Sequence, residues 1–280
     1  MEPKAADEKL IKSRCGQSVS DRLLRIFVPV VTLFLLAVAF LCLIGARRLC
    51  VKRSKEALSE ASLAGAAKLA GKIDGILEYY DALADTLEGA YFENDEGIKD
   101  EYAGSLNRFE EVPAGFYLGF DDGSYLDISG WKPEEGYDPR EQSWYTGGLG
   151  KKRMNLGDIW MSSDSGEPGV TMSREITLRD GRHGVFGADI FLNAIEAGVA
   201  SFSPCETGEA LLLNGEQIVA SPHAEYTATM LTAYPKNEFL SELARNIHLI
   251  TSPGEGGGLK ELDGKYVYFA AVPGADWTLV

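Results

Sequence analysis

The sequence predicts an α+β protein in which an apolar segment and a long helix precede two antiparallel sheet units. Three observations predict this class. Residues 26–46 contain no charged side chain, residues 49–91 contain no proline and follow a helical hydrophobic spacing, and four tight-turn dipeptides beyond residue 110 are each flanked by β-rich runs. Because a sheet must bury one face against another layer, this order predicts two sheet units packed on one long helix.

The apolar segment, residues 26–46, is long enough to cross a membrane. Its 21 residues would form a helix of roughly 31 Å at about 1.5 Å per residue, close to the hydrocarbon core of a bilayer. A signal peptide has an apolar core of about 7–15 residues and a short basic leader, whereas 25 residues precede this segment. The sequence therefore predicts an uncleaved N-terminal transmembrane helix over residues 26–46, with residues 1–25 as its leader.

The charge of the chain is divided unequally. The overall net charge is −15. Residues 1–55 hold eleven Lys/Arg and four Asp/Glu, a net charge of +7, and residues 56–280 have a net charge of −22. This acidity argues against nucleic acid as a partner, because phosphate contacts require a basic patch. Basic residues lie on both sides of the apolar segment, so the positive-inside rule gives no clear orientation.

A long helix is expected over residues 48–91. Its apolar side chains recur at spacings of four and three, which is a heptad stripe. The members of this stripe are Leu69, Ile73, Ile76, Tyr80, Leu83 and Leu87. Two interpretations stay open: the stripe packs on its own domain, or it forms the seam of a dimer.

Four hairpins are expected after residue 110. The dipeptides Asp122-Gly123, Asp180-Gly181, Asn214-Gly215 and Asp263-Gly264 supply the positive φ angles that tight turns require. Short helices are expected over residues 192–200 and 238–247.

The sequence offers no catalytic signature. The three histidines have no metal-ligand spacing, and the common hydrolase, redox and P-loop motifs are absent. We therefore expect no enzyme activity, metal or cofactor in this segment. Cys205 is the only cysteine of the large domain, so no internal disulfide is expected there, and a small buried residue is the simpler interpretation.

A candidate binding site combines an aromatic loop with a carboxylate in an apolar strand. Residues 130–145 are rich in aromatic side chains, and Asp189 lies between Phe186 and Ile190. A carboxylate in such a strand needs a partner, which is either a donor within the protein or a cationic ligand. In the second case Trp144, Tyr145 and Trp160 could offer ring faces to the cation. Structural packing is the alternative.

This order of parts resembles the double Cache sensor domain, the extracytoplasmic input of bacterial chemoreceptors, sensor histidine kinases and diguanylate cyclases. The segment YDPREQSWY at 137–145 is similar to the family's YDPRxRPWY segment, and GVFGADIFL at 184–192 to its GVxGxDIxL strand. GEALLLNGEQIVASP at 208–222 resembles the opening hairpin of the second unit. The resemblance implies two PAS-like units: residues 92–200, membrane-distal and carrying the ligand pocket, and residues 201–280, membrane-proximal and ending before a second transmembrane helix.

The resemblance also implies a ligand site. Its expected residues are Tyr137, Gln142, Trp144, Tyr145, Trp160, Ser162 and Asp189. In amino-acid-binding members an arginine stands at the Gln142 position and serves the ligand carboxylate, while the aspartate at the Asp189 position serves the ammonium group. Glutamine cannot form the bidentate charged pair with a carboxylate, so we expect an amine ligand first and an amino acid next. Arg140 is expected to form a structural ion pair with Asp138.

These features predict the small-molecule sensor domain of a bacterial transmembrane receptor, and a chemoreceptor is the first choice. The leader would be cytoplasmic, residues 48–280 would lie outside the cell membrane, and a homodimer is expected. The input domain of a histidine kinase or diguanylate cyclase is an alternative. A membrane-anchored surface or assembly protein without a small-molecule ligand is an alternative from another class.

Overall fold

A computed structural model describes residues 19–162, 166–204, 208–250 and 258–280 of the chain. The chain divides into two compact units, Met1–Ser54 and Lys55–Val280. Residues 1–18 of the leader and Cys205 lie outside the described residues, so what is expected of them stays a prediction.

Helix α2 runs from Val19 to Gly89 and contains residues 26–46 and most of residues 48–91, the two segments for which the sequence predicts helix. Residues 46–49 are Ala-Arg-Arg-Leu, and all four favour helix, so nothing ends the helix there.

The N-terminal unit contains the apolar part of α2. From Leu23 the helix is long and apolar enough to cross a membrane, and none of its most apolar window is buried. Phe27, Leu33 and Leu41 are 67%, 70% and 66% exposed. A soluble protein buries the apolar stripe of its core helices, and this segment has no such burial.

The second unit contains two five-stranded antiparallel sheets. The first sheet has the order β2-β1-β5-β4-β3 and the second the order β7-β6-β10-β9-β8. The strands of the first sheet are β1 (Tyr117–Phe120), β2 (Tyr125–Asp127), β3 (Asn155–Met161), β4 (Pro168–Thr177) and β5 (His183–Phe191). Those of the second are β6 (Leu212–Asn214), β7 (Gln217–Ala220), β8 (Gly258–Leu262), β9 (Lys265–Val272) and β10 (Trp277–Leu279).

All four expected hairpins are confirmed. They pair β1 with β2, β4 with β5, β6 with β7, and β8 with β9. The glycine of each turn dipeptide has a positive φ, for example +85° at Gly123, which other residues rarely adopt.

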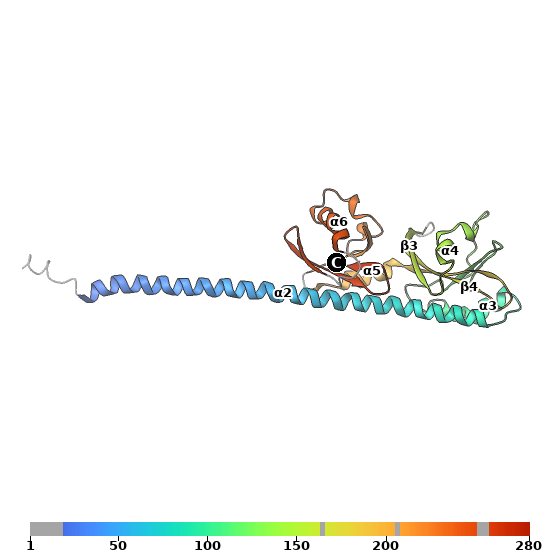
Figure 1. Ribbon diagram of the computed structural model, residues 1–280, viewed down its shortest axis with the longest axis horizontal. Helices are drawn as coiled ribbons and strands as arrows, with labels where there is room; N and C mark the ends of the chain where they lie inside the picture. The colour runs from blue at the N-terminus through green and yellow to red at the C-terminus, as the bar shows by residue number, and fades with distance from the viewer. Residues whose placement is uncertain (1–18, 163–165, 205–207, 251–257) are drawn as a thin grey trace, which may run out of the picture. The chain divides into compact units, whose positions relative to one another are not determined.

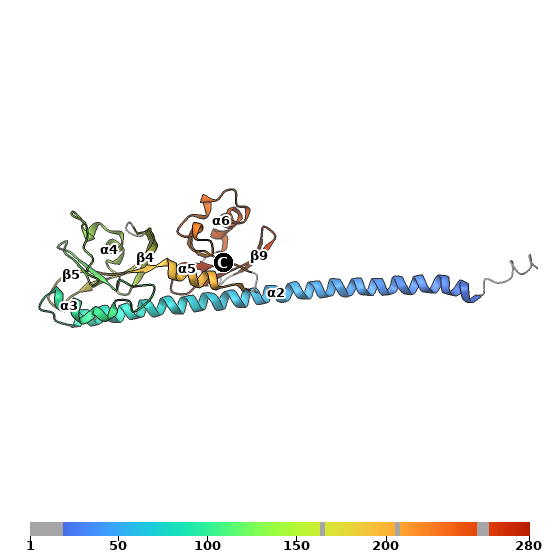
Figure 2. The same cartoon turned by 180° about the vertical axis from the view of Figure 1, so that it is seen from behind.

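Helices cover both sheets. They are α3 (Asp95–Tyr102), α4 (Ser143–Gly148), α5 (Leu192–Ser201) and α6 (Glu238–Ile250), with short 3₁₀ turns at Ala103–Ser105, Pro139–Glu141, Ala224–Tyr226 and Leu231–Ala233. Residues 55–89 of α2 run beside both sheets, and α4 and α6 lie on the sides of the sheets that face away from α2 (Figure 1). Seen from behind, α5 lies next to α2 between the two sheets (Figure 2). The expected helices over 192–200 and 238–247 are thus α5 and α6.

The heptad stripe of α2 is buried in its own domain. Ile73, Ile76, Tyr80 and Leu87 are at most 1% exposed and belong to the larger hydrophobic core, which includes side chains of both sheets. This stripe therefore packs on its own domain and is not free to form a dimer seam. The larger and the smaller core draw only on residues of the second unit, which thus holds its own cores.

The two faces of the first sheet differ in chemistry, because successive side chains of a strand point to opposite faces. On β5, Phe186, Ala188 and Ile190 are fully buried in the core that includes α2. Gly187 and Asp189 alternate with them and lie on the other face. The register places Thr171 of β4 opposite Asp189, so this second face is free to carry a polar site.

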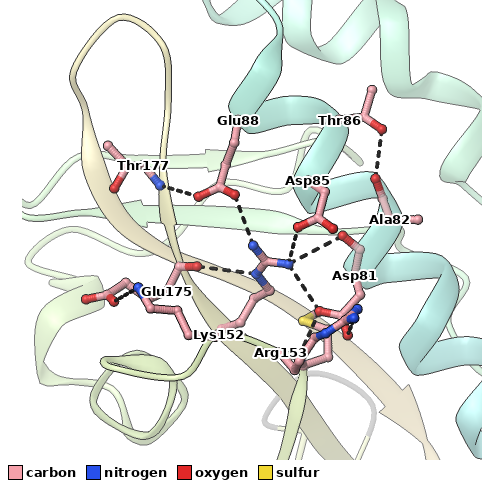
Figure 3. Close-up of polar contacts among 11 residues, drawn as sticks. Asp81, Ala82, Asp85, Thr86, Glu88, Lys152, Arg153, Glu175 and Thr177 are labelled. Carbon is pink, nitrogen blue, oxygen red and sulfur yellow. Dashed lines mark hydrogen bonds and ion pairs between the residues drawn. The ribbon is translucent and has the colours of Figure 1, made fainter.

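One charged residue breaks the apolar pattern on the α2 face. Arg174 of β4 is 5% exposed, and its guanidinium group binds carboxylates from successive turns of α2: Asp81 at 3.2 Å, Asp85 at 2.7 Å and Glu88 at 3.0 Å. Figure 3 shows these three acids on one side of the helix. Asp81 also accepts a hydrogen bond from the N–H of Met154, so α2 holds both β4 and the residue that precedes β3.

Candidate ligand-binding site

Asp189 lies on the second face of the first sheet, on its central strand β5. Its Oδ1 accepts hydrogen bonds from the hydroxyls of Tyr117 (2.8 Å) and Thr171 (2.6 Å). Thr171 in turn accepts a hydrogen bond from Nε1 of Trp160 at 3.0 Å. In the described part of the chain, no Lys or Arg forms an ion pair with Asp189. The carboxylate therefore has neutral donors on one oxygen and no countercharge.

Aromatic rings surround this carboxylate on the side of β1 and β2. The ring centroids of neighbouring members lie 4.9 to 6.2 Å apart, mostly edge to face. We call this group the aromatic cage; its members are Tyr117, Tyr125, Trp131, Tyr137 and Trp144. Nε1 of Trp144 also donates to the hydroxyl of Tyr137 at 3.3 Å. Aromatic rings are the side chains whose faces attract a desolvated cation, so the residue types of this group suit a cationic ligand.

Asp127 adds a second carboxylate to the same face. It is the register partner of Tyr117 and is 8% exposed. Its Oδ1 accepts hydrogen bonds from the N–H and hydroxyl of Ser129, and its Oδ2 accepts one from the hydroxyl of Tyr125 at 3.1 Å. These contacts with Ser129 stabilise the turn that follows β2. Asp127 also adds negative charge beside Asp189.

Glycines make room for the large rings. A Cβ atom at Gly119 would lie 2.7 Å from the ring of Trp144, and one at Gly187 would lie 2.5 Å from the ring of Tyr117. Gly169 likewise leaves room for Trp160, because a Cβ atom at Gly169 would lie 2.7 Å from the ring of Trp160. Any side chain at these positions would displace an aromatic wall of the site.

The surroundings of Asp189 disfavour its charge. Burial raises its pKa to about 6, the hydrogen bonds from Thr171 and Tyr117 oppose this, and the negative charge of Asp127 adds to the increase. Burial likewise raises the pKa of Tyr117 and Tyr125, so both hydroxyls stay protonated and donate. A cation beside Asp189 would relieve an electrostatic cost that the unliganded protein carries.

The structure brings only some of the expected site residues together. Tyr137, Trp144, Trp160 and Asp189 are linked through the cage and Thr171. Tyr145 is buried, but its hydroxyl donates to Asp121 at 2.6 Å.

The remaining expected residues make other contacts. Nε2 of Gln142 donates to the carbonyl of Asp138 at 3.3 Å. Ser162 follows β3, where its N–H donates to the carbonyl of Glu167. Arg140 forms the expected structural ion pair with Asp138, at 2.6 Å.

Sequence reasoning missed Tyr117, Tyr125, Asp127, Trp131 and Thr171 as site residues. Tyr125 and Asp127 alternate along one strand, which places them on one face. Only the register shows that this is the face of Asp189, because Tyr117 pairs with Asp127 on one side and with Gly187 on the other.

A cavity of about 590 Å³ adjoins the site. Trp144, Trp160 and Thr171 line it, whereas Asp189 lies behind Thr171 and does not. Within the described ranges, no group of three His, Cys, Asp or Glu side chains could hold a metal ion.

His183 bridges two carboxylates at the edge of this region. Its Nδ1 lies 2.7 Å from Oδ2 of Asp121, and its Nε2 lies 3.2 Å from Oε1 of Glu175. The hydrogen bond with Asp121 is the largest cause that raises the pKa of His183, although partial burial lowers it. A raised pKa means that the charged imidazole stabilises the fold below its ordinary pKa, and that this stabilisation is lost as pH rises through the folded-state value.

We therefore expect the second unit to unfold at a higher temperature at pH 6 than at pH 8, and His183→Gln to reduce this difference. Thermal unfolding of both proteins at the two pH values measures it, and the comparison between the proteins removes the contribution of Asp189. An equal difference in the two proteins would contradict the expectation.

The fold and the site together define a class. Two antiparallel sheets share one long helix, and the first sheet carries a group of aromatic and acidic side chains on the face opposite that helix. No protein-family model matches the chain, and no curated protein matches it.

Solved structures do match. The ligand-binding domain of the Pseudomonas aeruginosa PAO1 amino acid chemoreceptor PctC, in complex with GABA, is 22% identical with a TM-score of 0.62, and the match covers 80% of this chain and 97% of that one. The ligand-binding domain of Mlp24 with asparagine is 18% identical with a TM-score of 0.60, covering 81% and 92%. That of the P. aeruginosa chemoreceptor PctB with L-arginine is 21% identical with a TM-score of 0.57, covering 80% and 92%. The chain has the fold of these double Cache domains.

Proposed function

We propose that this chain is the extracytoplasmic sensor of a transmembrane receptor of the chemoreceptor kind, and that it binds an amine on the first sheet. The observation that carries the proposal is Asp189, a carboxylate without a cationic partner inside an aromatic cage. The fold supports it, because the matched domains are ligand-binding domains of chemoreceptors. We assign no catalytic role to this segment.

The charges of the site support an amine over an amino acid. A ligand carboxylate would need a cation, and the guanidinium of Arg140 already donates to both carboxylate oxygens of Asp138. Gln142 is neutral and its amide is directed to a backbone carbonyl. Asp189 and Asp127 offer two negative groups and the rings offer their faces, a combination that suits an ammonium group and repels a carboxylate.

Calorimetric titration of residues 55–280 with matched ligands tests the proposal. Butylamine and 2-phenylethylamine are L-norvaline and L-phenylalanine without their carboxylates, and butanoate has no amine. We expect each amine to bind more tightly than its amino acid and butanoate not to bind. Binding of butanoate, or a preference for both amino acids, would overturn the amine assignment.

Amine binding is also expected to depend on pH. Protonation of Asp189 removes the charge that attracts the ligand, so affinity for butylamine should fall as pH falls through about 6. Titrations at pH 5, 6, 7 and 8 measure this. A flat profile in the wild type would contradict a role for the ionised carboxylate.

The membrane anchor and a homodimer belong to the same proposal. The exposed apolar surface of α2 supports the anchor. With the heptad stripe buried, any dimer contact made through α2 would have to use its other faces. Labelling of a cysteine introduced at exposed Asp263 in intact cells tests the outside location, and labelling only after permeabilisation would overturn it.

A further inference from the structure

The cavity beside the aromatic cage is built by both sheets. Helix α4 and strands β3 and β4 supply one part of its lining, and the end of β6 and the turn between β9 and β10 supply the rest. The site on the first sheet therefore opens into a space that the second sheet helps to enclose.

Two residues that line this cavity, Thr171 and Trp144, also belong to the proposed amine site. Thr171 lines the cavity and donates to Asp189 at 2.6 Å. Trp144 lines the cavity and is a member of the cage, 4.9 Å from Tyr117 between ring centroids. A ligand held at the cage could extend along these side chains.

Two further carboxylates line the same cavity. Asp158 of β3 and Asp276 of the β9–β10 turn are the only charged residues of its described lining. Both are exposed, and neither has an ion pair or hydrogen bond with another residue of the described ranges. The cavity thus has carboxylates, aromatic walls and amide groups, but no lysine or arginine.

The β9–β10 turn also contacts α2. Gly274, with φ of +81°, lies so close to the carboxylate of Asp74 that an added Cβ atom would collide with it. Ala275 and Asp276 line the cavity next to it. A single turn therefore lies against the cavity and against the helix.

From this arrangement we propose that the ligand site is completed by the second sheet, and that it takes an elongated amine with two positive groups. One ammonium group lies in the aromatic cage near Asp189, and the other lies between Asp158 and Asp276. Asp276 is then a specificity-determining residue, and through its turn the ligand contacts an element that touches α2. This inference rests on the proposed amine-binding function.

Titrations of residues 55–280 with α,ω-diaminoalkanes of three to eight carbons test this, each compared with the n-alkylamine of the same length. A charge-assisted contact in the cavity should give one chain length an advantage of about tenfold or more over its monoamine. A diamine can enter a site for one ammonium group by either of its two equivalent ends, which alone raises its affinity about twofold over the monoamine. Asp276→Asn and Asp158→Asn should each reduce the advantage and leave monoamine affinity unchanged.

Asp263→Asn is the matched control. It removes the same charge from an exposed turn of the same sheet, outside the cavity lining, and should change neither affinity. Monoamine binding with a diamine advantage of only about twofold at every length would overturn this inference and leave the proposed function standing. Equal weakening of monoamines and diamines by Asp276→Asn would also overturn it. Failure of every amine to bind would overturn both.

Discussion

Asp189→Asn is expected to weaken butylamine binding by about thirtyfold or more. The substitution keeps the shape of the side chain but removes the charge that pairs with the ammonium group, and loss of one partner of a desolvated charge pair costs about 2–5 kcal/mol. Calorimetric titration at pH 8, where the wild-type carboxylate is ionised, measures the loss. Unchanged affinity would show that the amine binds elsewhere.

The same substitution should stabilise the unliganded domain. Burial raises the pKa of Asp189 to about 6 from 3.8, which corresponds to a cost of about 3 kcal/mol for the ionised form. An amide does not bear this cost, so Asp189→Asn should raise the free energy of unfolding at pH 8 by about 1–3 kcal/mol. Urea unfolding measures it, and a more stable protein that no longer binds the amine cannot be explained by misfolding. Asp263→Asn should change neither quantity.

Arg174→Met is expected to destabilise the second unit by about 3–5 kcal/mol, because it leaves a buried carboxylate without its main countercharge. Asp81 is 5% exposed, and its Oδ1 lies 3.2 Å from the Arg174 guanidinium. The methionine fills a similar volume, so packing changes little and the electrostatic loss dominates. Urea unfolding of residues 55–280 measures the difference.

Arg153→Met provides the matched control, because Arg153 contacts the same carboxylate at 3.6 Å from an exposed position, with its side chain 75% exposed. Exposed ion pairs contribute about 0–1 kcal/mol. Similar losses for the two arginines would contradict the view that burial of Arg174 sets the size of the effect.

Much of the fold could be predicted from the sequence because its signals are local. A dipeptide such as Asp122-Gly123 encodes its turn without reference to the rest of the chain. The sequence did not predict strand β3 and helix α4, because their local sequence signals are weak. Strand β3 contains a register shift between Leu156 and Ile159, which breaks alternation, and α4 has only six residues, two of them glycine.

The site was only partly predictable because it depends on register and side-chain direction. Asp189 and Trp144 stand out by residue type and neighbours. Asp127 joins them only because β2 pairs with β1 in one register rather than another. Tyr145 follows Trp144 in the sequence, yet its hydroxyl reaches Asp121. From the sequence, Arg174 would be expected to lie exposed on a strand, because nothing local indicates its three acidic partners on α2.

The alternation along β5 also bears on how ligand preference could change in evolution. Phe186, Ala188 and Ile190 maintain the core, while Gly187 and Asp189 shape the site. Side chains on opposite faces of a strand contact different neighbours, so a substitution at Asp189 leaves the contacts of the core side chains in place. Single mutations at the site positions can therefore change ligand preference, while the core residues between them keep the fold stable.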